Sequence, residues 1–205
     1  MITRCSYLGA VPAMALAASL TSAPARAQDD VVPGESYTWQ AQVRGAYVIP
    51  SNSHLPLPFN LNGAVVGELA GEWFFLPHWS TELDVASPAH LNVSSGAGAI
   101  SLTTQTWTAK YYFAATNGLT PYVQTGIYHA SASRDNTQPN IGVGNPGFGW
   151  TIGGGVTYGI APNAFVSLDV RYMNGLEPTL IVDGAPSGHI GIDPIVVGVG
   201  LGLRY

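Results

Sequence analysis

Large and small side chains alternate along the last segment of the chain, residues 194–205 (PIVVGVGLGLRY). In steps of two from Ile195 to Tyr205, one face carries large apolar residues and the other carries mainly glycines and Arg204. This is the repeat of a β-strand, because successive side chains of a strand point to opposite faces. Seven more segments are predicted as strands, with the faces of the fifth left unassigned: 37–49, 65–75, 79–86, 100–113, 122–133, 148–158 and 164–173. The sequence therefore predicts an all-β protein with eight strands.

The N-terminal residues 1–27 have the composition of a secretory signal peptide. A basic start with Arg4 precedes an apolar run at 7–20, and Ala25-Arg26-Ala27 forms a small-x-small cleavage pattern. The apolar run of about 14 residues is too short to span a bilayer as a helix. We therefore expect a signal peptide at 1–27 and one mature domain at 28–205, which lacks the single cysteine, Cys5.

The mature chain is poor in charge. Charged residues make up 9% of the sequence, whereas about 25% is usual for soluble domains. After residue 27 no apolar run reaches about 18 residues, so membrane-spanning helices are not expected. An exported, glycine-rich chain of this kind fits either a transmembrane β-barrel or a secreted β-sandwich.

The connections between the predicted strands favour the barrel. Short and long connections alternate, which is typical of a barrel with one periplasmic end and one external end. The short ones are 76–78, 114–120 and 159–163, and the long ones are 50–63, 87–99, 134–147 and 174–192.

The charged residues of the strands favour the same interpretation. They all fall on the face opposite the large apolar side chains: Arg44, Glu68, Glu72, Glu82, Asp84, Lys110, Asp169, Arg171 and Arg204. A transmembrane barrel places lipid outside and polar groups inside, whereas a sandwich would bury the aromatic face. We therefore predict an eight-stranded antiparallel transmembrane β-barrel with these nine residues in its lumen. Because buried charges persist only when they are paired or solvated, an internal salt-bridge network is favoured over an ion-selective filter.

Several stretches of the sequence resemble the outer membrane protein W (OmpW/AlkL) family. They are VRGAYVIP at 43–50, GEWFFLPHWSTELDVASPAH at 71–90, TAKYYFAATNGLTPYVQTGIYH at 108–129, GWTIGGGVTYGIAPNAFVSLDVRYM at 149–173 and IDPIVVGVGLGLRY at 192–205. The resemblance covers nearly all of the mature chain. Two departures are Tyr205, where Phe is more common, and Ile195, where Trp is frequent.

The resemblance implies a passive channel that takes up small hydrophobic molecules across the outer membrane of a Gram-negative bacterium, with release along the barrel or sideways through its wall. It also implies outer-membrane lipid as surroundings and a role as a receptor for bacteriocins in some members; phage is a further possible partner. A gate of bulky apolar side chains is implied as well. The candidates for it are Leu55, Leu57, Phe148 and Trp150.

Two other functions stay open. An eight-stranded barrel is only wide enough for side chains to fill it, so the chain could be an OmpA-like structural or receptor barrel with a plugged lumen and no transport. His129 and Ser131 share a strand face, as a His and Ser nucleophile pair do in lipid A hydrolases of the PagL type. No acidic partner for this pair is evident, and we expect no enzyme.

Other partners and cofactors are not expected. The remaining histidines, His54, His78, His90 and His189, lack the spacing of a metal site. Loss of Arg4 and Arg26 with the signal peptide leaves five basic residues against twelve acidic ones, so no basic surface for nucleic acid is expected. No cofactor motif is found either, because the glycines at 153–155 are not followed by the Lys-Ser/Thr of a phosphate loop.

The terminal Tyr205 is predicted to be an assembly signal, because an aromatic residue ends the closing strand and matches what the barrel-assembly machinery recognises. Deletion of Tyr205 should therefore reduce the amount of folded barrel in the outer membrane. The measurement compares unboiled and boiled protein on a denaturing gel, where a folded barrel migrates differently from the boiled chain. Normal insertion of the shortened chain would contradict the prediction.

Overall fold

A computed structural model describes residues 33–51, 62–92, 99–134, 141–144, 147–176, 179–182, 185–189 and 191–205. The predicted signal peptide lies outside these residues. The elements are α1 (Pro33–Ser36), β1 (Trp39–Ile49), β2 (Ala64–Leu76), β3 (Trp79–Ala86), β4 (Ala89–Asn92), β5 (Ala99–Tyr112), β6 (Leu119–Arg134), β7 (Ile141–Val143), β8 (Gly147–Ala161), β9 (Ala164–Asn174), β10 (Thr179–Val182), β11 (Ala185–His189) and β12 (Ile195–Arg204). Within the described residues, no helix has the length and apolar character needed to cross a membrane.

Eight of these strands close into a barrel. The order of neighbours is β3-β2-β1-β12-β9-β8-β6-β5, and pairing of β3 with β5 closes the ring. Every pairing in the wall is antiparallel. The first and last wall strands meet directly, with Gln40 opposite Arg204 and Ile49 opposite Ile195. The prediction of an eight-stranded antiparallel barrel is confirmed.

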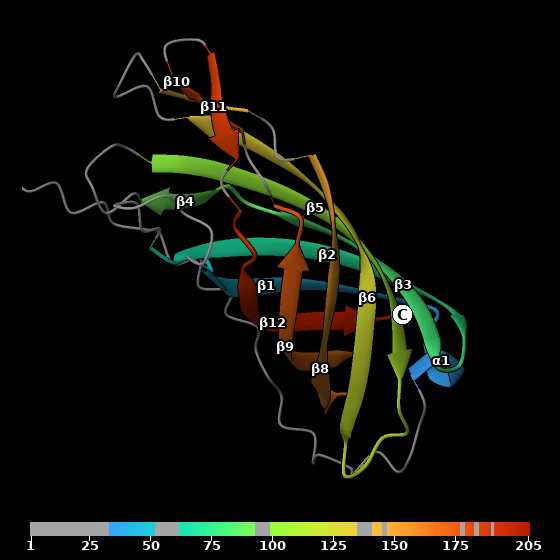
Figure 1. Cartoon of the computed structure of the whole chain (residues 1–205). Helices are drawn as coiled ribbons and strands as arrows, with labels where there is room; N and C mark the ends of the chain where they lie inside the picture. Colours follow the sequence, from blue (N-terminus) through green and yellow to red (C-terminus); the bar gives the residue numbers. More distant parts are fainter. Residues whose placement is uncertain are drawn as a thin grey trace, which may run out of the picture.

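The two ends of the barrel differ. Short turns, α1 and the C-terminus lie at one end, and β10 and β11 lie at the other (Figure 1). The predicted short connection at 114–120 contains a tight turn at Asn117-Gly118: both residues have positive φ, at 53° and 79°, and Thr116 and Leu119 exchange two backbone hydrogen bonds. Asn and Gly favour this turn because they tolerate a left-handed backbone.

The strand that follows β2 along the chain is interrupted, so that it forms two elements, β3 and β4. β3 and β4 pair with the same strand, β5, but Val85 faces Gln105 whereas Ala89 faces Leu102. One extra residue therefore lies between β3 and β4, at Ser87-Pro88, which is the geometry of a β-bulge. The predicted loop at 87–99 was wrong in this part, because the strand resumes at Ala89.

The bulge also ends the pairing with β2. The ladder between β2 and β3 ends at Glu68 and Ala86, and Ser87 N–H then donates to the Gly67 carbonyl at 2.7 Å. Beyond this bond, the described parts of β2 and β4 share no ladder. The wall therefore has an unpaired gap between these two strands, toward the end with long connections.

Two predicted long loops contain strands. β7 lies within 134–147, and the hairpin of β10 and β11 lies within 174–192. These three form a separate small sheet in the order β11-β10-β7. Their sequences, IGV, TLIV and APSGH, are too short to show a clear two-residue repeat.

The barrel is apolar outside and polar inside. Large hydrophobic side chains are exposed on every strand of the wall, and charged and amide side chains are buried within it. The faces of 122–133, which the sequence left unassigned, are now clear: Tyr122, Gln124 and Tyr128 point inward, whereas Val123 and Ile127 point outward. Such an inverted distribution suits a protein surrounded by lipid.

Glycines on the inner face leave room for the buried side chains. A Cβ atom on Gly200 would lie within 2.6 Å of Ser167 Oγ and Arg44 Cγ, so no larger residue fits there without displacing them. Gly45, on the outer face of β1, has no such neighbour within 4 Å.

We expect Gly200→Ala to lower the free energy of unfolding by about 1–3 kcal/mol, the usual cost of an overpacked interior. Gly45→Ala is the matched control and should change it by less than about 0.5 kcal/mol. Urea unfolding of both variants in detergent micelles measures the difference. Equal stability of the two variants would contradict a tightly filled interior.

Candidate functional site

The interior of the barrel is divided into a charged half and an apolar half. The charged half lies toward the short turns, and all nine charged residues that the sequence places in the lumen are buried there. The apolar half lies toward the long connections. The candidate site is the space where the two halves meet.

Arg44 on β1 is the centre of the charged half. Its Nε lies 2.9 Å from Glu68 Oε2 and its Nη1 lies 3.1 Å from Glu82 Oε1. Its Nη2 donates to Asp84. One guanidinium therefore joins carboxylates from β2 and β3, which is the arrangement that its planar set of donors favours.

Two further cations complete the ion-pair network. Arg171 on β9 donates to both carboxylate oxygens of Glu68 and lies 3.1 Å from Asp169. Lys110 Nζ on β5 lies 2.6 Å from Glu82 and 3.3 Å from Glu72. The network therefore crosses the barrel from β9 to β5 and obstructs its axis.

Neutral side chains also donate hydrogen bonds to two of the glutamates. Glu72 accepts hydrogen bonds from the Tyr112 hydroxyl at 2.9 Å, from Ser80 and from Gln40. Glu82 also accepts one from Gln42 at 2.8 Å. Sequence analysis missed these neutral partners, although they share the inward parity of the charged residues.

Arg204 occupies a different environment near the short turns. It donates to Thr157 Oγ1 at 3.0 Å and lies over the rings of Tyr37 and Phe165. Tyr37 in turn donates to the Pro162 carbonyl at 2.7 Å. Among the described residues, Arg204 forms no ion pair, so cation–π contacts and neutral acceptors hold it.

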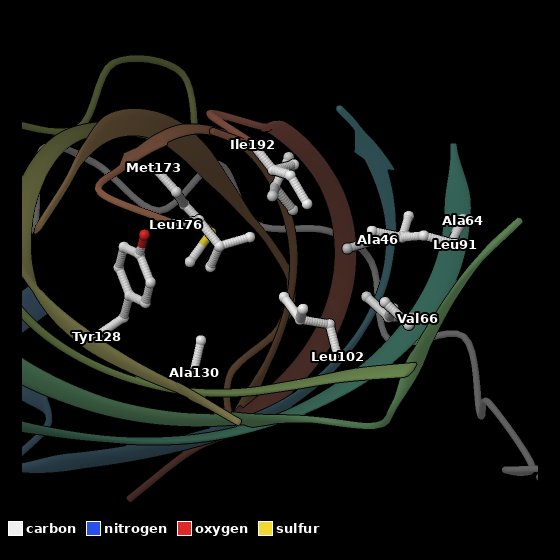
Figure 2. Close-up of a cluster of buried hydrophobic side chains, with 12 residues drawn as sticks. Ala46, Ala64, Val66, Leu91, Leu102, Tyr128, Ala130, Met173, Leu176 and Ile192 are labelled. Atoms are coloured by element: carbon white, nitrogen blue, oxygen red, sulfur yellow. The ribbon is translucent and has the colours of Figure 1, made fainter. Parts of the chain in front are cut away.

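The apolar half contains a small cavity of about 30 Å³ that is open at its mouth. Its floor contains Glu68, Thr106 and Arg171, which belong to or adjoin the ion-pair network. Figure 2 shows the apolar side chains that point into this half from several strands. The buried cluster consists of Ala46, Ala64, Val66, Ala89, Leu91, Leu102, Tyr128, Ala130, Met173, Leu176, Ile192 and Val196. We call this space the apolar chamber.

Comparison with protein families gives a match over almost the whole chain. Residues 13–204 match the family described as outer membrane protein beta-barrel domain. The chain belongs to this family. No curated protein matches.

Solved structures of outer-membrane barrels share the fold of this member of the family. OprG from Pseudomonas aeruginosa is 17% identical with a TM-score of 0.63, covering 86% of this chain and 99% of OprG. AlkL, solved in lipid bilayers, is 15% identical with a TM-score of 0.58, covering 90% and 95%. OmpW from E. coli is 18% identical with a TM-score of 0.54, covering 83% and 98%. This outer-membrane barrel therefore has an OmpW/AlkL-type fold.

The predicted gate residues do not line the chamber of this outer-membrane barrel where the structure describes them. Phe148 and Trp150 are 75% and 47% exposed on the outer face of β8. Their assignment as a gate was wrong, because the parity of their strand directs both toward lipid. Leu55 and Leu57 lie outside the described residues.

Other described residues are buried beside the chamber instead. Tyr128, Leu176 and Ile192 are buried at the chamber. Alternation within the predicted strand 122–133 was ambiguous, so the sequence did not identify Tyr128. Leu176 follows β9 and Ile192 precedes β12. Outside a strand, no two-residue repeat predicts which way a side chain points.

The His129 and Ser131 pair lies on the outer face of the barrel. The ring of His129 packs against Phe148, with centroids 4.9 Å apart. Within the described residues, no group of three His, Cys, Asp or Glu side chains could hold a metal ion. His129 and Ser131 therefore point outward from the barrel wall. Among the described residues, no carboxylate forms an ion pair with His129.

Tyr205 lies where the closing strand meets the first strand. Its backbone N–H donates to the Trp39 carbonyl at 2.8 Å, and its own carbonyl accepts from Thr38 and Trp39. Its side chain is 68% exposed. The backbone contacts extend barrel closure to the last residue, and the role of Tyr205 as an assembly signal stays a prediction.

We expect Arg44→Met to lower the free energy of unfolding by about 3–5 kcal/mol, because it leaves Glu68, Glu82 and Asp84 buried without their shared cation. Arg204→Met removes an equally large buried cation that has no carboxylate partner among the described residues, so its cost should be smaller, about 1–2 kcal/mol. Urea unfolding at neutral pH measures both. A larger loss for Arg204→Met would contradict the central place of Arg44.

Proposed function

We propose that the barrel is a passive channel for the uptake of small hydrophobic molecules across the outer membrane. The observation that carries this proposal is the apolar chamber, which opens in the half with long connections. Val66, Leu91, Leu102 and Val196 line it, and apolar side chains of this kind favour apolar ligands. The resemblance to the OmpW/AlkL family supports the same function.

The exit that we propose is lateral. The network of Arg44, Arg171 and Lys110 with its carboxylates crosses the axis below the chamber, and passage through it would separate buried ion pairs at high cost. The wall offers another path, because the described parts of β2 and β4 are unpaired beyond the bond between Ser87 and Gly67. A hydrophobic molecule that leaves there enters lipid without separating an ion pair.

The same proposal covers export and assembly. Residues 1–27 would direct export and be removed, and the barrel-assembly machinery would insert the chain with Tyr205 as its signal. The short turns would then face the periplasm, and the chamber would open outside. The lipid-facing belt includes Trp39 and Trp73, whose rings stack 6.0 Å apart, as aromatic residues do at membrane interfaces.

A structural or receptor barrel is the second candidate function. The observation that favours it is the ion-pair network itself, which fills the charged half and holds β1, β2, β3, β5 and β9 together. In this case solutes would not pass, and bacteriocins or phage would bind the external end. Uptake measurements separate the two candidates.

The test fills the chamber without altering the outer surface. Ala89 on β4 is buried and lines the chamber, whereas the next residue, His90, is exposed. Ala89→Phe should lower uptake of a hydrophobic solute to the level of cells without the protein, and His90→Phe should leave it unchanged. Uptake is followed as appearance of a fluorescent hydrophobic probe in the outer membrane.

Equal amounts of folded barrel, judged by the gel shift on boiling, are required for all variants. Uptake equal in cells with and without the unaltered protein would exclude the channel and leave the structural or receptor barrel. Uptake by Ala89→Phe equal to that of the unaltered protein would show that solutes bypass the chamber.

A further inference from the structure

Two short segments fold over the apolar chamber at the end with long connections. One follows β9 and contains Gly175 and Leu176, and the other precedes β12 and runs from Gly191 to Pro194. Ile192 N–H donates to the Leu176 carbonyl at 2.8 Å, and Met173 N–H donates to the Pro194 carbonyl at 3.0 Å. Gly175 N–H donates to Asp193 Oδ1 at 3.3 Å. We call this pair of segments the clasp.

The clasp directs two side chains into the barrel. Leu176 and Ile192 are only 1% and 0% exposed, although both lie beyond the ends of strands. Both line the chamber and belong to its buried cluster. Figure 2 shows them projecting into the interior from the same side. They therefore cover part of the chamber that the wall strands leave open.

The backbone of the clasp is suited to movement. Gly175 has a φ of 90°, a left-handed conformation that lets the chain turn inward directly after β9. Each wall strand is held by a continuous ladder on both sides over most of its length, such as that of β12 with β1 and β9. The clasp lies outside the ladders of the wall, and segments outside such ladders open at a lower free energy than the strands of a wall do.

Asp193 is the side chain that fastens the clasp. Of the three bonds, the one to Gly175 uses a side-chain acceptor, a carboxylate oxygen of Asp193 at 3.3 Å, so it is the bond that a substitution can remove. The bond lies at the turn itself, next to Leu176. Its loss would free Gly175 and withdraw the support from the residue that covers the chamber.

We propose that the clasp is the external gate of the chamber, with Leu176 and Ile192 as its closing side chains and Asp193 as its latch. The proposal rests on the uptake function for its purpose, because a gate matters only if solutes enter. The movement itself is independent of that function. Opening breaks the bond from Gly175 to Asp193 and the bond from Ile192 to Leu176, and exposes the chamber to the outside.

The first experiment measures access to the chamber. Val196 is buried on β12 and lines the chamber, so Val196→Cys in a Cys5→Ser background gives one reporter thiol. A small, charged, membrane-impermeant thiol reagent is added from outside, and the rate of labelling is compared in three forms of the protein. Asp193→Ala should label up to about tenfold faster than the form with Asp193, the factor that corresponds to loss of one hydrogen bond. Asp193→Asn keeps an acceptor oxygen and should stay close to the form with Asp193.

Equal labelling rates in all three forms would overturn the gate. If Asp193→Ala fails to give the gel shift of a folded barrel, Ile192→Ala replaces it, because it removes a closing side chain and leaves the latch in place. Ile192→Ala should also label faster, and labelling at the unaltered rate would overturn the gate equally.

The second experiment separates the gate from the channel. Uptake of the hydrophobic probe by Asp193→Ala should exceed that of Asp193→Asn if solutes enter through the clasp. Faster labelling without any uptake by the unaltered protein would support a movable clasp and refute transport. Uptake by the unaltered protein with equal labelling rates would support transport and refute the clasp as its gate.

Discussion

The ion pairs around Arg44 are the interaction on which the rest of the barrel depends. A wall surrounded by lipid cannot carry charge on its outer face, so the charged side chains of the strands must lie inside and must be paired there. Arg44 meets this requirement by joining Glu68, Glu82 and Asp84. The inner glycines of β12 and β8 follow from the same requirement, because a narrow barrel has little room beside such side chains.

This pairing divides the molecule along its axis. Carboxylates and cations fill the half near the short turns, and Tyr37, Phe165 and Arg204 close its end. The other half is lined mainly by apolar side chains and contains the cavity. In the proposed channel, such a charged floor would select against water-soluble molecules, since the proposed exit avoids the ion pairs by leaving through the wall.

Much of this arrangement could be predicted from the sequence, and its failures have physical reasons. The inward direction of the nine charged residues could be predicted from the alternation along each strand, because charged side chains are kept off the lipid-facing side. The faces of β6 could not be predicted, because polar and apolar residues occur on both of them. Its inner face carries Tyr122, Gln124 and Tyr128, and its outer face carries Thr125 and His129. Phe148 and Trp150 were assigned to a gate by resemblance, against the parity of their own strand. The clasp had no periodic signal, since Leu176 and Ile192 are placed by backbone bonds between segments distant in sequence.

The bulge at Ser87-Pro88 has a consequence for how this barrel tolerates change. Even-numbered residues point inward along β3, and odd-numbered residues point inward along β4. The extra residue thus reverses which residues point inward. It joins β3, whose inward side chains face the charged half, to β4, whose inward side chains face the apolar half. Loss of a single residue there would turn His90 toward the chamber and Leu91 toward lipid. The two halves of the interior therefore depend on the length of the chain at this position as much as on the side chains themselves.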